Sequence, residues 1–135
     1  MADIRLNLVI KVSPEKVYDA ITTRKGIESW WCKQTTAKPE KGFVNVFVFG
    51  QFRNEMKITE LSHKRVAWDC INSIEEWTGT KVSFDLEERD GNTLLRFTHG
   101  DWKSATDLFA SCNYDWAKFL RSLKSFCETG EGEPR

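Results

Sequence analysis

Histidine is the side chain best suited to acid–base chemistry near neutral pH, because its unperturbed pKa is about 6.5. His99 falls on the inward-facing side of a strand expected at residues 93–99, where it would orient a ligand carbonyl or act as a general base. The alternative is a structural histidine whose ring is hydrogen-bonded to a loop carbonyl. His63 lies in a polar turn and is expected at the surface.

The four cysteines, Cys32, Cys70, Cys112 and Cys127, are too far apart for chemistry that needs paired thiols. Zinc sites and redox motifs use closely spaced ligands, and no carboxylate stands at ligand spacing from either histidine. We therefore expect no metal and no cofactor, with the cysteines reduced and acting as small apolar side chains. The sequence also lacks the G-x-S-x-G, H-E-x-x-H, P-loop and G-x-G-x-x-G signatures, so no catalytic residue is assigned.

Aromatic side chains are the unusual feature of this chain, which has 9 Phe, 6 Trp and 2 Tyr among 135 residues. Each buries about 150–250 Å², so the chain has more than enough bulk for a core. The rings either fill the interior or line a cavity for a flat or lipid-like hydrophobic molecule. The candidate ligand-binding residues are Trp30, Trp31, Trp68, Phe84, Phe97, His99, Trp116 and Phe119.

The charges balance, with 20 basic and 20 acidic side chains and a formal net charge of zero. Non-specific nucleic-acid binding and a polybasic membrane anchor both need a positive field, so neither partner is expected. No apolar stretch approaches the ~20 residues needed to span a bilayer, and no secretory signal follows Met1. The expected setting is therefore cytoplasmic.

The elements that position these side chains begin with residues 4–12, whose alternation of apolar and polar side chains predicts a half-buried strand. Ser13 is a good N-cap and is followed by a proline suited to the first helical position, which predicts a short helix over residues 14–22. Residues 24–31 are expected to form a second short helix or turn, and the polar residues 32–42 a loop.

Five further strands are expected, at residues 43–49, 53–61, 65–71, 80–88 and 93–99. The first of these five has both faces apolar. At a sheet edge such a strand is prone to pair with a second copy, which suggests a homodimer. The alternative is that its valines contact the preceding loop or lie exposed.

The last two strands form a hairpin around Asp90-Gly91, a strong signal for a two-residue turn. With this turn, Asp85 faces Arg96 as a cross-strand charge pair on the outer face. A slip of one residue would oppose aromatic and polar side chains, so the register is well determined. The inner face then pairs Leu86 with Leu95, Phe84 with Phe97 and Val82 with His99.

A long amphipathic helix is expected from an N-cap at Ser104 to about Glu128, with Trp116 and Phe119 on its apolar face. Residues 129–135 are polar and are expected to form a flexible tail. The fold class is therefore α+β: a curved six-stranded antiparallel sheet wrapped around the long C-terminal helix, with two short helices between the first two strands. This is the helix-grip arrangement, and its single domain spans residues 1–128.

Five segments of the sequence, in this order, resemble those of a known family: residues 13–20 (SPEKVYDA), 30–31 (WW), 66–68 (VAW), 80–84 (TKVSF) and 93–100 (TLLRFTHG). With the order of elements, they resemble the START-like (SRPBCC) superfamily. The sequence is similar, more narrowly, to single-domain relatives of the C-terminal domain of the activator of heat-shock-protein-90 ATPase. The resemblance covers nearly the whole chain and implies a fold with a ligand cavity, but no particular reaction.

Three functions are consistent with these features. The first is a small binding protein whose internal apolar cavity takes a lipid-like or aromatic molecule. The second, implied by the resemblance, is a co-chaperone-like module that binds a heat-shock-protein-90-type chaperone. We expect this chain to lack the activator's additional N-terminal domain. The third is a cyclase-like enzyme that uses His99 as its base, which is the reading with the least support.

Overall fold

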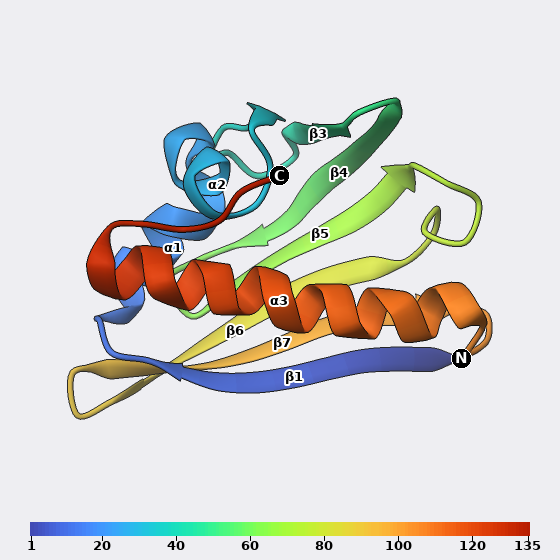
Figure 1. Ribbon diagram of the computed structural model, residues 1–135. Coiled ribbons are helices and arrows are strands. Elements are labelled where there is room, and N and C mark those ends of the chain that lie inside the picture. The colour runs from blue at the N-terminus through green and yellow to red at the C-terminus, as the bar shows by residue number, and fades with distance from the viewer.

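One antiparallel sheet and one long helix dominate the computed structural model, which describes residues 1–135 (Figure 1). The sheet order is β1-β7-β6-β5-β4-β3-β2, so most neighbours in the sheet are also neighbours along the chain. The elements are β1 (Ala2–Ile10), α1 (Pro14–Thr22), α2 (Arg24–Trp30), β2 (Gln34–Thr36), β3 (Val44–Phe49), β4 (Phe52–Leu61), β5 (Arg65–Asn72), β6 (Lys81–Arg89), β7 (Asn92–Trp102) and α3 (Asp107–Thr129).

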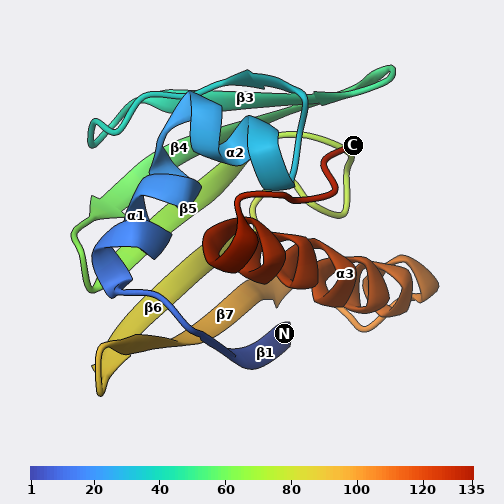
Figure 2. The ribbon, with the colours of Figure 1, turned by 60° about the vertical axis from the view of Figure 1, so that its left-hand side comes forward.

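The helix-grip class is confirmed, because α3 lies along one face of the curved sheet while α1 and α2 pack beside its C-terminal end (Figure 2). The sheet has seven strands instead of the expected six. The additional strand, β2, lies in the segment expected to be a loop and pairs with β3 through Thr35 and Phe47. Three residues are too few to show an alternating pattern. As a result β3 is not an edge strand, and the two edges are β1 and β2.

The β6–β7 hairpin has the predicted register, with Phe84 opposite Phe97. Asp85 faces Arg96 as predicted, but the ion pair expected between them does not form. Asp85 instead accepts a hydrogen bond from Arg65 of β5 at 2.7 Å. Arg65 is directly opposite Asp85 on the other side of β6, so it competes for the same carboxylate. Arg96 reaches diagonally to Glu87, at 2.9 Å.

The helix boundaries follow the predicted caps, with one shift. Ser13 caps α1, as expected, and its side chain accepts from the Lys16 N–H. α3 begins two residues later than predicted: its N-cap is Thr106, not Ser104, and the Thr106 hydroxyl accepts from the Phe109 N–H at 3.2 Å. The same hydroxyl donates to Glu76 at 2.6 Å, so the cap is also tied to the β5–β6 connection.

The polar C-terminal residues, expected to be flexible, run back between α3 and α2 (Figure 2). The Arg135 N–H donates to the Trp31 carbonyl at 2.8 Å, and the Lys33 N–H donates to the Arg135 carbonyl at 2.7 Å. The Glu133 N–H donates to Ser122 Oγ at 2.6 Å. The backbone just after α2 and a side chain of α3 supply these partners, and a sequence pattern cannot show them. No helix of the protein is both long and apolar enough to cross a membrane.

Candidate functional site

The predicted ligand-binding aromatics come together between the sheet and α3, where they form one continuous cluster. Trp31 lies at its centre, with ring centroids 5.2 Å from Trp116 and 6.1 Å from Trp68. Phe97 joins the cluster from β7, 4.4 Å from Trp116 and 5.2 Å from Phe84. All the predicted residues except Phe119 are at most 1% exposed. The rings therefore fill most of the interior expected to be a cavity.

An apolar pocket of about 420 Å³ lies beside this cluster, and 9 of its 13 lining residues are hydrophobic. Three of the predicted site residues line it: Trp31, Trp116 and Phe119. The other five predicted residues pack in the core away from it. The remaining lining residues are Phe49, Gly50, Phe52, Asn54, Ile74, Trp77, Leu108, Cys112, Asp115 and Arg135.

One wall of the apolar pocket comes from α3, where side chains at spacings of three and four residues share a face. Leu108, Cys112 and Trp116 follow this spacing and line the pocket. The opposite wall comes from the β3–β4 hairpin, whose turn includes Gly50 at a φ of 61°. Phe52 stands at the rim of this wall and is 53% exposed. The pocket is therefore open to solvent on this side.

Several lining residues were absent from the predicted site. Phe49 and Phe52 are opposite each other across the β3–β4 turn, and the glycine between two phenylalanines was a usable signal for this arrangement. Trp77 lies in the β5–β6 connection and lines the apolar pocket, although it was not among the predicted ligand-binding residues. Arg135 reaches the pocket through the docked C-terminal segment, and no sequence signal pointed to it.

His99 is fully buried and does not line the apolar pocket. The Trp116 indole N–H donates to His99 Nδ1 at 3.0 Å, so we assign the ring proton to Nε2. Nε2 lies 2.8 Å from Thr80 Oγ1, and this hydroxyl donates to the Trp77 carbonyl at 2.5 Å. Burial lowers the pKa of His99 to about 3. The ring is thus neutral with both nitrogens engaged, and this geometry favours a structural histidine over a general base.

The cysteine thiols are held in their protonated form. Burial raises the pKa of Cys70 to about 11 and that of Cys127 to about 12. It also raises the pKa of Cys112, the one cysteine that lines the apolar pocket. Because the thiolate is the reactive form, these thiols are poor nucleophiles. No group of three His, Cys, Asp or Glu side chains is arranged to hold a metal ion.

The polar groups of the apolar pocket are few. The Trp31 indole N–H is buried and has no hydrogen-bond acceptor. The Arg135 guanidinium carbon lies 4.8 Å from the centre of the Phe119 ring. Its Nη2 is 4.0 Å from Asp115 Oδ1, at the outer limit of an ion pair. Asn54 is satisfied, since its Nδ2 donates to the Phe47 carbonyl and its Oδ1 accepts from a serine hydroxyl.

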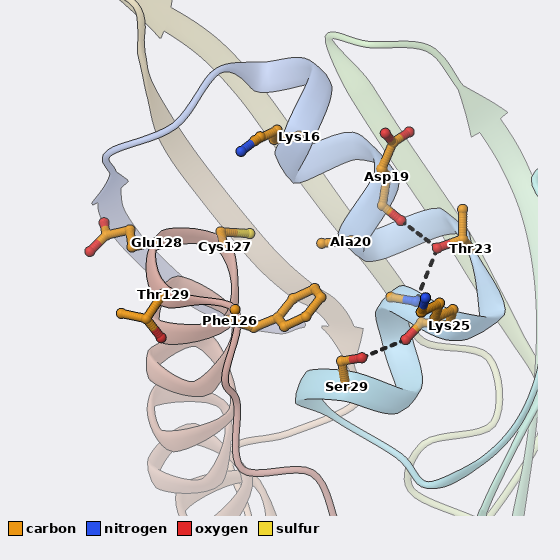
Figure 3. Close-up of a pocket in the computed structure, with 12 residues that line it drawn as sticks. Lys16, Asp19, Ala20, Thr23, Lys25, Ser29, Phe126, Cys127, Glu128 and Thr129 are labelled. Atoms are coloured by element: carbon orange, nitrogen blue, oxygen red, sulfur yellow. Dashed lines mark hydrogen bonds between the residues drawn. The ribbon is translucent and has the colours of Figure 1, made fainter.

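A second hollow, of about 610 Å³, lies between α1, α2 and the end of α3 (Figure 3). Only 3 of its 12 lining residues are hydrophobic. Its hydrogen bonds are local to the helices, such as Thr23 to the Asp19 carbonyl and Ser29 to the Lys25 carbonyl. We therefore assign the candidate site to the smaller apolar pocket.

The curved sheet, the long helix α3 packed on it and the aromatic pocket define an α+β domain of the SRPBCC type. Residues 11–128 match the family described as activator of Hsp90 ATPase homolog 1-like protein. The chain belongs to this family. No curated protein sequence matches it.

Solved structures with the same fold include one from Colwellia psychrerythraea, the solution structure of an Aha1 dimer. It is 40% identical to this chain, covers 98% of it and 100% of its own chain, and superposes with a TM-score of 0.90. Protein SSP2350 from Staphylococcus saprophyticus is 18% identical, with a TM-score of 0.82 and coverage of 98% of this chain and 96% of its own. Protein BH1534 from Bacillus halodurans is 17% identical, with a TM-score of 0.77 and coverage of 95% and 98%.

Proposed function

We propose that this protein binds a small apolar molecule, lipid-like or aromatic, in the apolar pocket between α3 and the β3–β4 hairpin. The observation that carries the proposal is a concave, largely hydrophobic lining of about 420 Å³, within the size range of small-molecule sites. Phe52 and Ile74 at its rim are 53% and 37% exposed. Covering them with a ligand removes apolar surface from water, which stabilises the complex by about 25 cal/mol per Å².

Tryptophan fluorescence tests this function, because Trp31, Trp77 and Trp116 line the apolar pocket. We expect saturable changes on adding fatty acids of increasing length or fused-ring aromatic molecules. Replacing Phe52→Ser should weaken binding about tenfold, because a rim contact of roughly 1.4 kcal/mol is lost.

The matched control for the Phe52 variant is Tyr114→Ser on the solvent-facing side of α3. Tyr114 is 68% exposed and is not part of the pocket lining. Its replacement should leave binding unchanged. An absence of any saturable change across the whole ligand panel would contradict the proposed function.

A chaperone contact is the second candidate function, and it is supported by membership of the family of activator of Hsp90 ATPase homolog 1-like proteins. A pull-down with a heat-shock-protein-90-type chaperone tests it, with binding expected at tens of micromolar or better. Failure to bind at that concentration would count against this candidate and would leave the small-molecule site unaffected.

A homodimer is also proposed, supported by the Colwellia psychrerythraea relative, whose structure is described as a dimer. β1 is a free edge of the sheet, and its unpaired backbone groups are available to a second copy. Light scattering after size-exclusion chromatography should then give about twice 15.7 kDa. A mass equal to one chain at high micromolar concentration would exclude the dimer.

The reducing, cytoplasmic setting is likewise a proposal, supported by four free cysteines.

A further inference from the structure

We propose that the molecule taken by the apolar pocket carries an acid group, so that the ligand is an aromatic or aliphatic carboxylate whose apolar part lies against Trp116 and Phe119 and whose carboxylate pairs with Arg135. This inference rests on the proposed function and names the ligand class of the same pocket. It depends on the charge of the lining and on which of its hydrogen-bond donors a ligand can reach.

Arg135 is held at the pocket by its backbone. Its N–H donates to the Trp31 carbonyl at 2.8 Å and its carbonyl accepts from the Lys33 N–H at 2.7 Å. Its guanidinium then lies over the Phe119 ring, at 4.8 Å. A cation stacked on an aromatic ring keeps its edge donors free, and a guanidinium edge fits a carboxylate with two parallel hydrogen bonds. Arg135 is thus placed to bind an acid group beside an apolar surface.

The other hydrogen-bonding groups of the lining do not offer a place for a polar group of the ligand. The indole nitrogens of Trp31 and Trp77 are shielded from solvent. Asn54, the polar amide of the lining, already has partners for both its Nδ2 and Oδ1. The half-exposed Arg135 guanidinium is therefore the charged donor that a ligand can reach.

Asp115 is the other charged residue of the lining, and its contact with Arg135 is weak. The 4.0 Å separation is longer than the ~2.7–2.9 Å of a strong charge-assisted hydrogen bond. A ligand carboxylate at the shorter distance competes well for the guanidinium. A cationic ligand would meet Arg135 as a like charge, so the inferred ligand is an anion.

Calorimetric titration of 2-naphthoate and 2-naphthamide at pH 7 tests this inference, because the two probes share ring and shape and differ in charge. We expect naphthoate to bind at least about tenfold more tightly, since a hydrogen bond to a charged group is worth at least that factor. Arg135→Gln should remove this preference. It removes a half-exposed side chain, and the backbone hydrogen bonds that hold the segment do not depend on it.

Two further variants make the test specific. Asp115→Asn should increase the naphthoate preference, because it removes a competitor for Arg135 and a like charge. Lys118→Gln, which removes an exposed cation of α3 outside the pocket lining, should leave the preference unchanged.

The possible outcomes separate this inference from the function on which it rests. Equal binding of the two probes, with Phe52→Ser weakening both, would overturn the acid-group inference and leave the apolar pocket as a binding site. Binding of neither naphthalene probe, together with no response to any member of the fatty-acid and fused-ring panel, would overturn both. A naphthoate preference that survives Arg135→Gln would also overturn the inference, because the anion would then be recognised elsewhere.

Discussion

His99 illustrates how a residue with catalytic chemistry becomes part of the core. Its ring accepts from the Trp116 indole and lies against Thr80, which in turn donates to the Trp77 carbonyl. Both ring nitrogens and the Thr80 hydroxyl have a partner, so burial of the neutral ring leaves no unmet hydrogen bond at this site. These hydrogen bonds also fix the indole of Trp116, which lines the apolar pocket.

The burial of His99 predicts a specific dependence of stability on pH. Its pKa is about 3 in the folded protein, below the 6.5 of the unfolded chain, so the unfolded state binds the proton more readily. The stabilisation is complete above pH 6.5 and declines as the pH falls toward 3, by about 2 kcal/mol at pH 5. Urea unfolding of the wild type and His99→Gln at pH 7 and pH 5 should show a smaller loss in the variant. Equal losses would contradict the assignment of a buried neutral histidine.

The elements that carry the site depend on Ser122 of α3, which joins three segments. Its hydroxyl donates to the Trp30 carbonyl at 2.7 Å and accepts from the Glu133 N–H at 2.6 Å. α3, the end of α2 and the C-terminal segment are therefore linked through one buried side chain. This link lies next to the backbone hydrogen bonds that place Arg135 at the pocket.

Replacing Ser122→Ala is expected to lower the free energy of unfolding by about 1–3 kcal/mol, because the Trp30 carbonyl and the Glu133 N–H both lose their partner. Amide hydrogen exchange at Glu133 and Arg135 should become faster, since the C-terminal segment loses one of its anchors. Ser111→Ala, at an exposed position on the same helix, is the control and should change neither quantity. Unchanged exchange in Ser122→Ala would show that the backbone bonds alone hold the segment.

The predictability of these elements followed the range of the interactions that form them. The β6–β7 hairpin was predicted in full register because Asp90-Gly91 and the alternation of its strands are local signals. β2 was missed because its three residues are too few to show an alternating pattern and are held by pairing with a neighbouring strand, β3. The pair of Arg65 and Asp85 was also missed, because Arg65 lies on a neighbouring strand that the hairpin pattern does not include.

Three lining residues of the candidate site were predicted from the sequence: Trp31, next to α2, and Trp116 and Phe119 of α3. Trp116 and Phe119 were found because helical spacing places them on the apolar face of α3. The rim residues Phe52 and Ile74 were missed, because their position depends on how a hairpin and a connection fold over that helix. Arg135 depends on backbone pairing with residues after α2, which no periodicity shows.

At the scale of the whole molecule, the aromatic content serves two purposes. Most of the rings fill the space between the curved sheet and α3, so the deep interior is solid. The remaining hydrophobic surface opens on one side of α3, where the apolar pocket lies. Asp115 and Arg135 are the charged side chains of that pocket, and the whole chain has a formal net charge of zero.

The six tryptophans divide evenly between the two environments, which allows one direct measurement of the central claim. Trp31, Trp77 and Trp116 line the apolar pocket, whereas the other three do not. In a two-dimensional ¹H–¹⁵N spectrum titrated with 2-naphthoate, the indole resonances of those three tryptophans should move. The indole resonances of Trp30, Trp68 and Trp102 should stay in place. Movement confined to these last three, or no movement of any indole, would contradict the assignment of the apolar pocket as the binding site.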